Sequence, residues 1–441
     1  MQFYKCSLKE IKMEINNKII KAISKSIKGT EYENKVFVVG GFVRDLIMGK
    51  DPKDIDLLID GDINAGAGIT FAEWFCKKEN IFKKDSNPLV YGLYGTAMFQ
   101  FMGEKIECVA PRSEKYQNDS RKPVVSSCTL EDDCFRRDFT VNSLFINISN
   151  NELVDYSKNG LNDIKNKVIR STSNPDIIFT EDPLRILRAI RFATRFNSTI
   201  EEKTFEGMKR HVDRLEIISK ERIQDEFSKM ITSDNPEFAI RLLFEIGAYK
   251  YVFDKLMFES NLKYLAKSIP ASFERLKMQK DAEHNNLEIN LAIVYAQLPN
   301  VVNKMKYLKF SNDVIKKVCF YLELFDMILF TNFTPASIRK VQYLAKSYDN
   351  LFNACTIFVS VMNRKGDIER VEKILNMTKE MIEKGQAMFD YKLPVNGNDV
   401  MEILNINPSK NVKRYLNLLM DMAYANPFIT KKECETILKC N

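Results

Sequence analysis

The pattern of apolar and polar positions divides the chain into a mixed α/β part and a helical part. Up to about residue 165, short apolar or alternating runs predict strands at 36–39, 54–59, 96–102, 105–109 and 153–154. A short helix is expected after Gly40-Gly41, over 42–48. After about residue 179 the apolar residues recur with helical spacing, which predicts helices near 181–196, 201–213, 219–232 and 236–249.

This order of elements predicts an α+β fold, with an N-terminal mixed-sheet head followed by an all-helical body. We expect three parts: a head over 1–165, a helical neck over 166–250, and a helical body with its tail over 251–441. The Lys-rich start, residues 1–28, is interpreted as the first helix of the fold. Later helices are expected to be separated at prolines 270, 299, 335 and 408.

Composition narrows the possible functions only a little. A formal net charge of +7 is compatible with a polyanionic partner, and equally with a basic protein that has none. Nine scattered cysteines without a CxxC pair, and only two histidines, argue against a zinc site and against a histidine general base. These thiols favour a reducing compartment. We therefore expect a cytoplasmic protein, with a mitochondrial or nuclear copy as the alternative.

The strongest chemical signal in the head is a pair of aspartates on a predicted strand. Alternate strand residues share a face, so Asp54 and Asp56 present two carboxylates together. Two such groups suit a pair of Mg²⁺ ions about 4 Å apart, as used in phosphoryl transfer. Glu107, on a neighbouring strand, is the candidate third catalytic carboxylate. The alternative for Glu107 is an ordinary solvent-facing strand residue.

A glycine turn precedes this pair. Gly40 and Gly41 allow backbone N–H groups to approach a phosphate, and the N-terminus of the following helix adds partial positive charge. Arg44, in the first turn of that helix, can reach the same phosphates. Either motif alone is weak evidence, but the sequence strand, glycine pair, helix, strand with an aspartate pair is far more specific.

A stripe of arginines marks the first predicted helix after the head. Thr180 is interpreted as its N-cap, and Asp182, Arg185, Arg188 and Arg191 recur every third residue. The remaining positions of this helix are mostly apolar. A charged face open to solvent is therefore the weaker interpretation, because little of the helix can be free.

Together these motifs resemble those of tRNA nucleotidyltransferases (CCA-adding enzymes), of the class II that eukaryotes and most bacteria share and that includes bacterial poly(A) polymerases. The resemblance begins with residues 40–45 (Gly-Gly-Phe-Val-Arg-Asp) and the aspartate pair at 54–56. Three further blocks match in order: residues 136–143 (Arg-Arg-Asp-Phe-Thr-Val-Asn-Ser), 181–192 and 221–223.

The resemblance implies a polymerase-β-like head that adds C, C and A to the 3′ end of tRNA without a template. CTP and ATP would be the substrates, two Mg²⁺ ions the cofactors, and pyrophosphate the leaving group. Asp182 would accept from the amino group of cytosine or adenine, and Arg185 would donate to the ring nitrogen beside it. Uracil and guanine show the opposite polarity at this edge and would leave a buried carboxylate facing an acceptor.

The family likeness also assigns roles to the remaining polar residues of these blocks. Asp138 is carried over as the contact for the ribose 2′-OH, and Arg136 or Arg137 as a phosphate contact. Arg188 and Arg191 would hold the triphosphate or orient the template pair. An A-adding tRNA enzyme and a poly(A) polymerase of the same class remain alternatives, and so does an inactive RNA-binding protein. The polar stretch 116–134 occupies the place of a family loop that favours full CCA addition.

Basic clusters in the body are candidate contacts for the tRNA phosphates. The residues proposed are Lys304, Lys306, Lys309, Arg339 and Lys340. The alternative for each cluster is a solvated helix face. No protein partner is implied, and no segment is long and apolar enough to predict a membrane span.

Overall fold

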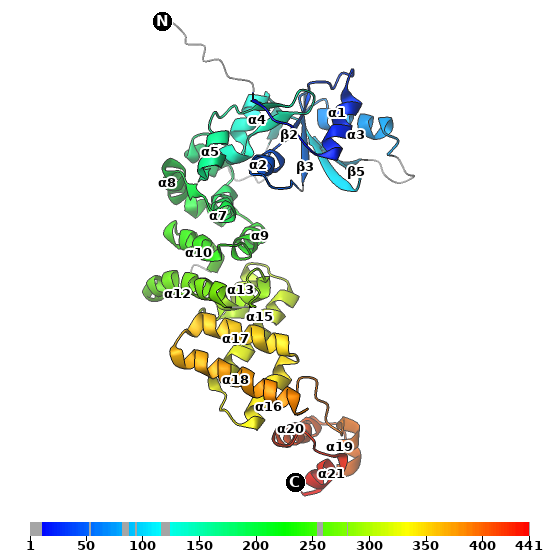
Figure 1. The fold of residues 1–441 in the computed structure, drawn as a ribbon, viewed down its shortest axis with the longest axis vertical. Helices are drawn as coiled ribbons and strands as arrows, with labels where there is room; N and C mark the ends of the chain where they lie inside the picture. Colours follow the sequence, from blue (N-terminus) through cyan, green and yellow to red (C-terminus); the bar gives the residue numbers. More distant parts are fainter. Residues whose placement is uncertain are drawn as a thin grey trace. The chain divides into compact units, whose positions relative to one another are not determined.

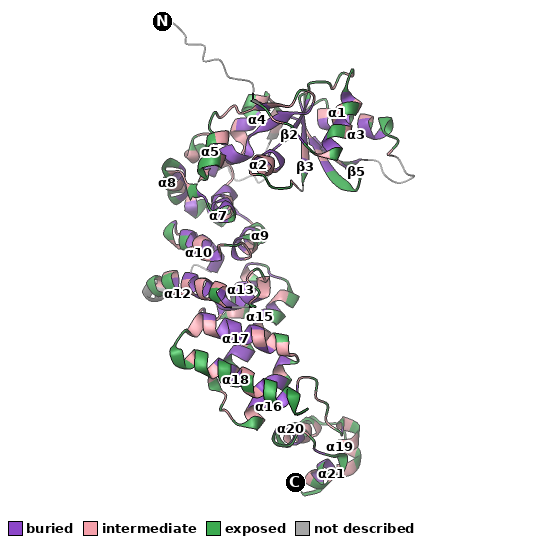
Figure 2. Cartoon of the chain, viewed as in Figure 1, coloured by how far each residue is buried: buried purple, intermediate pink, exposed green. Residues whose placement is uncertain are grey.

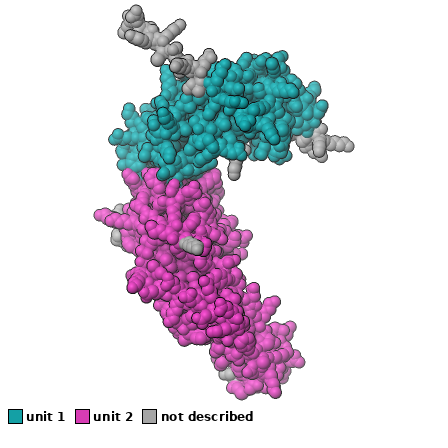
Figure 3. Space-filling model, viewed as in Figure 1, with its two compact units in different colours: residues 1–218, 246–248 teal, residues 219–245, 249–441 magenta. Residues whose placement is uncertain are grey.

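The computed structural model describes residues 11–52, 54–81, 88–92, 95–115, 124–253, 259–279 and 281–440. A mixed sheet with helices is followed by a long series of helices (Figure 1), so the predicted α+β fold class is confirmed. The chain forms two compact units, which Figure 3 colours separately: residues 1–218 with 246–248, and residues 219–245 with 249–441. The division into three parts at 165 and 250 stays a prediction.

Within the described residues, the first unit contains an eight-stranded sheet in the order β1-β10-β9-β2-β3-β6-β5-β4. The strands are β1 (Ile11–Lys12), β2 (Val36–Val39), β3 (Ile55–Ile59), β4 (Leu89–Tyr91), β5 (Thr96–Phe101), β6 (Glu104–Val109), β9 (Phe145–Asn147) and β10 (Glu152–Val154). Every pair is antiparallel except β3 with β6, which run parallel and place Asp56 opposite Glu107. A separate hairpin joins β7 (Arg112–Lys115) to β8 (Val124–Ser127).

The two faces of this sheet differ in character. One face buries Ile55, Leu57 and Ile59 of β3 under α1 (Lys18–Ile27) and α3 (Ala67–Lys78), which lie beside each other in Figure 1. Leu58 packs in a smaller cluster on the opposite face. Because strand residues alternate between faces, the side chains flanking Leu57 belong to that second face. The sheet therefore carries its acidic residues on the side away from the main core.

The glycine pair ends β2 and starts α2 (Gly41–Ile47) as expected. Gly40 has φ 67° and ψ −128°, a backbone conformation that residues with a Cβ rarely adopt. The long N-terminal helix expected over 1–28 is wrong in part, because residues 11–12 form a strand and α1 begins only at Lys18. Asn17 caps α1 by accepting from the backbone N–H groups of Ile19 and Ile20.

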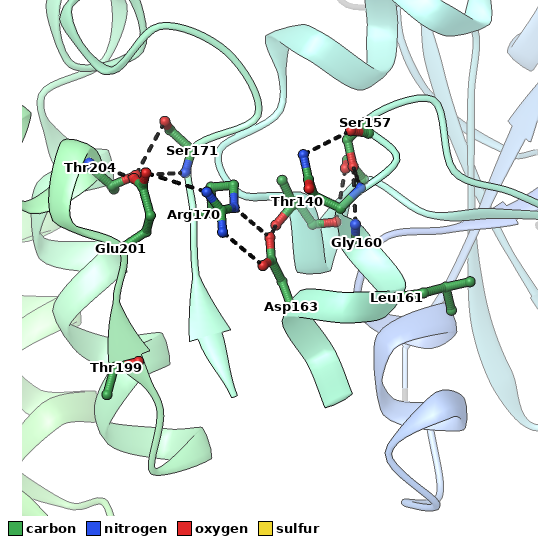
Figure 4. Close-up of polar contacts among 12 residues, drawn as sticks. Thr140, Ser157, Gly160, Leu161, Asp163, Arg170, Ser171, Thr199, Glu201 and Thr204 are labelled. Carbon is green, nitrogen blue, oxygen red and sulfur yellow. Dashed lines mark hydrogen bonds and ion pairs between the residues drawn. The ribbon is translucent and has the colours of Figure 1, made fainter. Parts of the chain in front are cut away.

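The rest of the first unit is mainly helical. Its elements are α4 (Leu130–Arg136), the 3₁₀ turn η2 (Thr140–Asn142), α5 (Gly160–Asn166), β11 (Val168–Ile169), α6 (Pro175–Glu181), α7 (Leu184–Phe196), β12 (Thr199–Ile200), α8 (Glu202–His211) and η3 (Val212–Ile217). A polar cluster links η2 and α5 to the residues that follow β11 and precede α8, as Figure 4 shows. Asp163 accepts from Thr140 Oγ1 at 2.7 Å and from Arg170 Nε at 3.0 Å, and Arg170 also pairs with Glu201 at 3.3 Å.

The helix that carries the arginine stripe starts later than the sequence indicated. Thr180 is not its N-cap but lies inside the preceding helix α6, which ends at Glu181. Asp182 is extended, with φ −135° and ψ 96°, and Pro183 immediately precedes α7. Proline disfavours the helical conformation in the residue before it, which explains why Asp182 separates α6 from α7. Ten of the 13 residues of α7 are buried, including Arg185.

The second unit is built entirely of helices in its described residues. They are α9 (Lys220–Ile231), α10 (Pro236–Glu245), α11 (Tyr249–Phe253), α12 (Glu259–Met278), α13 (Leu287–Tyr295), α14 (Val301–Tyr307), α15 (Asn312–Phe330), α16 (Pro335–Ala345), α17 (Tyr348–Met362), α18 (Lys365–Glu383), α19 (Gly397–Leu404), α20 (Lys410–Ala425) and α21 (Lys431–Cys440). Pro270 lies inside α12 and does not separate two helices, so that expectation is wrong.

Helical amphipathicity explains how these helices pack. Figure 2 shows α18 with buried and exposed stripes, and its buried residues Val371, Ile374, Thr378 and Met381 recur at three- and four-residue intervals. The last helices form a separate small core around Val400, Leu419 and Leu438. None of the described helices combines the length and apolar character that crossing a bilayer requires.

Close packing of α3 on the sheet gives a test of this fold. A Cβ at Gly68 would lie 2.9 Å from the carbonyl oxygen of Cys108 and 3.0 Å from that of Gly95. We expect Gly68→Ala to destabilise the head by about 1–3 kcal/mol, because the backbone must move apart. The only tryptophan, Trp74, lies in α3 and reports head unfolding by its fluorescence in urea. Gly366→Ala, which meets no atom within 4 Å, is the control and should leave that transition unchanged.

Candidate active site

A cleft of about 620 Å³ lies within the first unit, bounded by the acidic face of the sheet and by α7. This volume is within the range of roughly 300–1,000 Å³ that is usual for small-molecule sites. All the residues that the sequence suggested for catalysis and nucleotide binding line it: Gly40, Gly41, Arg44, Asp54, Asp56, Glu107, Arg136, Arg137, Asp138, Asp182, Arg185, Arg188 and Arg191. The glycine turn, the aspartate pair, Glu107, residues 136–138 and the arginine stripe thus meet at one place.

The sheet side of the cleft is acidic. Asp54 is exposed just before β3, Asp56 is half-buried, and the parallel register sets Asp56 opposite Glu107 on β6. Burial, together with the charge of Glu107, raises the pKa of Asp56 to about 6. The charges of Glu107 and Asp54 thus add to the cost of ionising Asp56, and a bound cation would relieve that repulsion.

The donor set suits magnesium that arrives with a substrate. Carboxylate oxygens are the ligands that Mg²⁺ prefers, and it is usually held by one or two carboxylates together with substrate phosphates and water. In the part of the chain that the structure describes, no three histidine, cysteine or acidic side chains are close enough to enclose an ion by themselves. Asp54 and Asp56 could therefore supply part of the coordination, with a triphosphate supplying the rest.

On the opposite side of the cleft, an ion pair joins α7 to the second block, residues 136–143. Arg188 Nη2 and Nε lie 2.6 and 2.9 Å from Asp138 Oδ2, and Asn142 Nδ2 donates to Asp138 Oδ1 at 3.0 Å. Burial opposes ionisation of Asp138, but Arg188 and Asn142 outweigh it and lower its pKa to about 2. The ionised Asp138, predicted from the sequence to contact the ribose, thus holds Arg188 in place.

The proposed base-reading pair lies where the chain enters α7. Asp182 Oδ1 accepts from the backbone N–H of Leu184 at 3.1 Å. Arg185 Nη2 donates to the carbonyl of Arg136 at 2.7 Å, and its Nη1 is 3.5 Å from Glu181 Oε2. That Nη1 is buried and has no hydrogen-bond acceptor among the described residues. An unmet buried donor costs about 1–3 kcal/mol, so this nitrogen is suited to bond an acceptor on a ligand in the cleft.

Arg44 is less free than the sequence suggested. Its Nη1 donates to Asn142 Oδ1 at 2.5 Å and its Nε to Asp45 at 2.8 Å, and its guanidinium carbon lies 4.7 Å from the ring centre of Phe196. Arg44 thus connects α2 to α7 as well as lining the cleft. Asn142 bridges Arg44 and Asp138, so one continuous polar network runs from the glycine turn to the arginine helix.

Three polar residues that line the cleft were given no role from the sequence: Arg112, Asn142 and Arg195. Arg195 could have been found, since it follows Arg191 by four residues on the same helix. Asn142 lies in the block 136–143, where its spacing from Asp138 is a usable signal. Arg112 has no such signal, because its place in the cleft depends on how β7 packs against α4, where Asp133 accepts from its backbone N–H.

Two of the five predicted RNA contacts are wrong. Lys304 is buried and its ammonium donates to the carbonyl of Phe253 at 3.1 Å. Arg339 is also buried and donates to the carbonyls of Tyr424 and Gln386. Both therefore hold helix ends together inside the second unit. Lys306, Lys309 and Lys340 are exposed, and their contact with RNA stays a prediction.

The chain matches two known family models. Residues 36–170 match the poly A polymerase head domain, and residues 197–259 match the probable RNA and SrmB-binding site of polymerase A. The first match covers the sheet, the glycine turn, the aspartate pair and the second block.

Similar proteins extend this likeness over the whole chain. A Schizosaccharomyces pombe protein, tRNA nucleotidyltransferase cca2, is 25% identical over 97% of this chain and 98% of its own length. The mitochondrial CCA tRNA nucleotidyltransferase of Saccharomyces cerevisiae is 36% identical over 48% of this chain and 42% of its own. The Bacillus stearothermophilus CCA-adding enzyme, solved with CTP, has the same fold, with a TM-score of 0.71, 21% identity and 95% coverage of both chains.

Residues 36–170 therefore form a head similar to that of poly A polymerases. Over nearly its whole length the chain is similar to proteins named tRNA nucleotidyltransferases, and it has the fold of a CCA-adding enzyme.

The raised pKa of Asp56 gives a prediction for the protein without metal. Above about pH 6 the folded protein must keep a carboxylate ionised in unfavourable surroundings, whereas the unfolded chain ionises it freely near pH 3.9. Asp56→Asn removes that cost, so it should stabilise the head by on the order of 1–3 kcal/mol at pH 7.5 in EDTA.

The gain should shrink as the pH falls from 6 to 4, because the folded protein then protonates Asp56 and no longer keeps it ionised in unfavourable surroundings; below about pH 4 the carboxyl is neutral in both states. Urea titration followed by Trp74 fluorescence at several pH values measures it. A variant less stable than the parent at pH 7.5 would show that the acidic face carries no such repulsion.

Proposed function

We propose that the chain adds C, C and A in turn to the 3′ end of tRNA, using CTP and ATP and releasing pyrophosphate. The likeness to proteins named tRNA nucleotidyltransferases supports the reaction type. The observation that carries the proposal is the cleft itself, in which the carboxylates of β3 and β6 face the arginines of α7. One side suits metal-assisted phosphoryl transfer, and the other suits recognition of a base and a triphosphate.

On the acidic side, Asp54 and Asp56 would hold two Mg²⁺ ions, and Glu107 would assist as a third carboxylate. When bound, these ions lower the pKa of the RNA 3′-hydroxyl and stabilise the pyrophosphate that leaves. The backbone N–H groups of Gly40 and Gly41, with Arg136 and Arg137, would orient the triphosphate in line with that hydroxyl. Positioning of this kind supplies much of the catalysis in phosphoryl transfer.

Base selection would depend on Asp182 and Arg185. The buried Nη1 of Arg185 has no hydrogen-bond acceptor among the described residues, so it can donate to the ring nitrogen of cytosine or adenine. The Asp182 carboxylate would accept from the neighbouring amino group. Uracil and guanine present a protonated ring nitrogen there, so both contacts would fail at once. Arg188 and Arg191 would contact the triphosphate or hold Asp138 in place.

The second unit would bind the tRNA through its exposed basic residues, among them Lys306, Lys309 and Lys340. Such contacts read backbone charge and shape, as an enzyme acting on many tRNAs needs. Residues 116–123 of the loop that favours complete CCA addition lie outside the described part. We further propose a cytoplasmic location, with a mitochondrial or nuclear copy as the alternative.

Single labelled triphosphates test the reaction. With tRNA lacking its last three nucleotides, we expect incorporation from CTP alone, further addition when ATP is supplied with CTP, and dependence on Mg²⁺. Asp54→Ala should abolish incorporation but leave tRNA binding intact, because only the metal ligand is lost. Asp60→Ala is the matched control, since that exposed aspartate follows the other end of β3. Use of ATP without CTP on this substrate would instead indicate an A-adding enzyme.

Replacing the base-reading arginine tests selectivity. Arg185→Ala should lower the ratio of CTP to UTP incorporation by roughly ten-fold or more, because the donor that rejects uracil is gone. Arg210→Ala, which changes an exposed arginine of α8 paired with Asp176, is the control. Competition between labelled CTP and UTP gives the ratio directly. An unchanged ratio would assign base selection to another residue.

A further inference from the structure

A fully buried carboxylate, Asp133, lies behind the two arginines of the second block. Its oxygens accept from both of them: Oδ1 from Arg136 Nη2 at 2.6 Å and Nε at 3.0 Å, and Oδ2 from Arg137 Nε at 2.9 Å. Arg137 Nη2 also lies 2.9 Å from Oδ2. The backbone N–H of Arg112 donates to Oδ1 at 3.3 Å. Each guanidinium thus presents the same Nε–Nη2 edge to one carboxylate.

Arg136 and Arg137 line the cleft, whereas Asp133 does not. The exposed fraction of the Asp133 side chain is 0%, against 21% for Arg136 and 16% for Arg137. Any effect of Asp133 on a bound nucleotide must therefore pass through the two arginines.

The local sequence explains how the Asp133 carboxylate can bond both arginines. Thr129 caps α4 through a capping box with Asp132, which fixes the first turn of the helix. Arg136 and Arg137 follow Asp133 by three and four residues, the two spacings that share a helix face. Arg136 is in the last turn of α4 and Arg137 is its extended C-cap, so the two side chains reach the same carboxylate from different backbone conformations.

The charge of Asp133 is maintained despite its burial. Burial opposes ionisation, but Arg137 and Arg136 outweigh that effect and lower the pKa of Asp133. A bare pair of adjacent guanidinium groups would repel each other and sample many rotamers. The shared Asp133 carboxylate offsets the repulsion between the two guanidinium groups and restricts their rotamers before a ligand binds. Groups that are already ordered lose less free energy on binding.

We propose that Asp133 is a positioning residue for triphosphate binding: it holds Arg136 and Arg137 in the geometry that receives the phosphates. This inference rests on the proposed role of those two arginines. It assigns no contact with the base, so selection between CTP and UTP should not depend on Asp133.

The test compares Asp133→Asn with Glu131→Gln in the full chain. Both remove one negative charge from α4 and nearly preserve side-chain size, but Glu131 is exposed and lies outside the cleft. We expect Asp133→Asn to raise the Kd for CTP, measured by calorimetry, at least ten-fold, and to raise KM for CTP and ATP alike. The CTP to UTP ratio should change less than two- to three-fold, because Asp133 makes no contact with the base. Glu131→Gln should match the parent.

A merely structural role predicts a different pattern. In that case Asp133→Asn would lower the urea midpoint while the folded protein kept the parental Kd, and the proposal would be overturned. A double-mutant cycle gives a second criterion. In an Arg136→Gln, Arg137→Gln background, Asp133→Asn should no longer weaken CTP binding, because the groups it positions are absent. A ten-fold loss that persists there would also overturn it.

The outcome is separable from that of the proposed function. Calorimetric binding of CTP requires neither tRNA nor turnover. If the protein extends no tRNA but binds CTP in a manner that depends on Asp133, the reaction assignment fails and the positioning role stands. If it adds CCA normally with Asp133→Asn at the parental Kd and KM, only the positioning role fails.

Discussion

The parallel pairing of β3 with β6 is the constraint on which the rest of the site depends. It is the only parallel pair among the described strands of a sheet that is otherwise antiparallel, and it sets Asp56 opposite Glu107. Burial and the charges of Glu107 and Asp54 raise the pKa of Asp56, and Arg137 and Lys105 only partly offset them. Across the cleft, Arg188 of α7 is committed to its ion pair with Asp138. We propose that a cation arriving with its substrate completes the acidic face.

The acidic and basic side chains of the cleft can act separately, because each group is held by a different element of secondary structure. The strands fix the carboxylates, α7 fixes the arginine stripe, and α4 fixes Arg136 and Arg137 through Asp133. Asn142 links these parts by bonding both Arg44 and Asp138. Rigid supports of this kind let phosphate, base and metal contacts be arranged independently, which suits an enzyme whose substrate base must change while its chemistry stays the same.

Much of this could be predicted from local pattern. The alternation around Asp54 and Asp56, the glycine pair and the helical spacing of the arginines all follow from geometry that neighbouring residues determine. The α+β order and most strand positions were therefore correct, and the glycine pair, the aspartate pair, residues 136–138 and the arginine stripe do meet in one cleft. Local spacing could also have linked Asp133 to Arg136 and Arg137, which follow it by three and four residues. What local pattern could not show was tertiary, such as the approach of Arg112 to Asp133.

The errors have equally specific causes. Lys304 and Arg339 were predicted to be surface charges because the sequence does not show which backbone carbonyls at helix ends need a buried donor. Their aliphatic stems can pack among apolar side chains. Thr180 resembled an N-cap, but it lies inside α6, and Pro183 disfavours the helical conformation at Asp182, so α7 begins only at Leu184. Pro270 was expected to end a helix, yet α12 continues through it, so neighbouring packing outweighs the lost hydrogen bond.

The central claim is that two aspartates on one strand face bind divalent cations together with a triphosphate. Titration with Mn²⁺, followed by its electron paramagnetic resonance signal with and without CTP, tests it most directly. We predict tight Mn²⁺ binding only when CTP is present, and loss of that binding in Asp54→Ala and in Asp56→Ala. Equal binding without CTP, or binding that survives both substitutions, would contradict it.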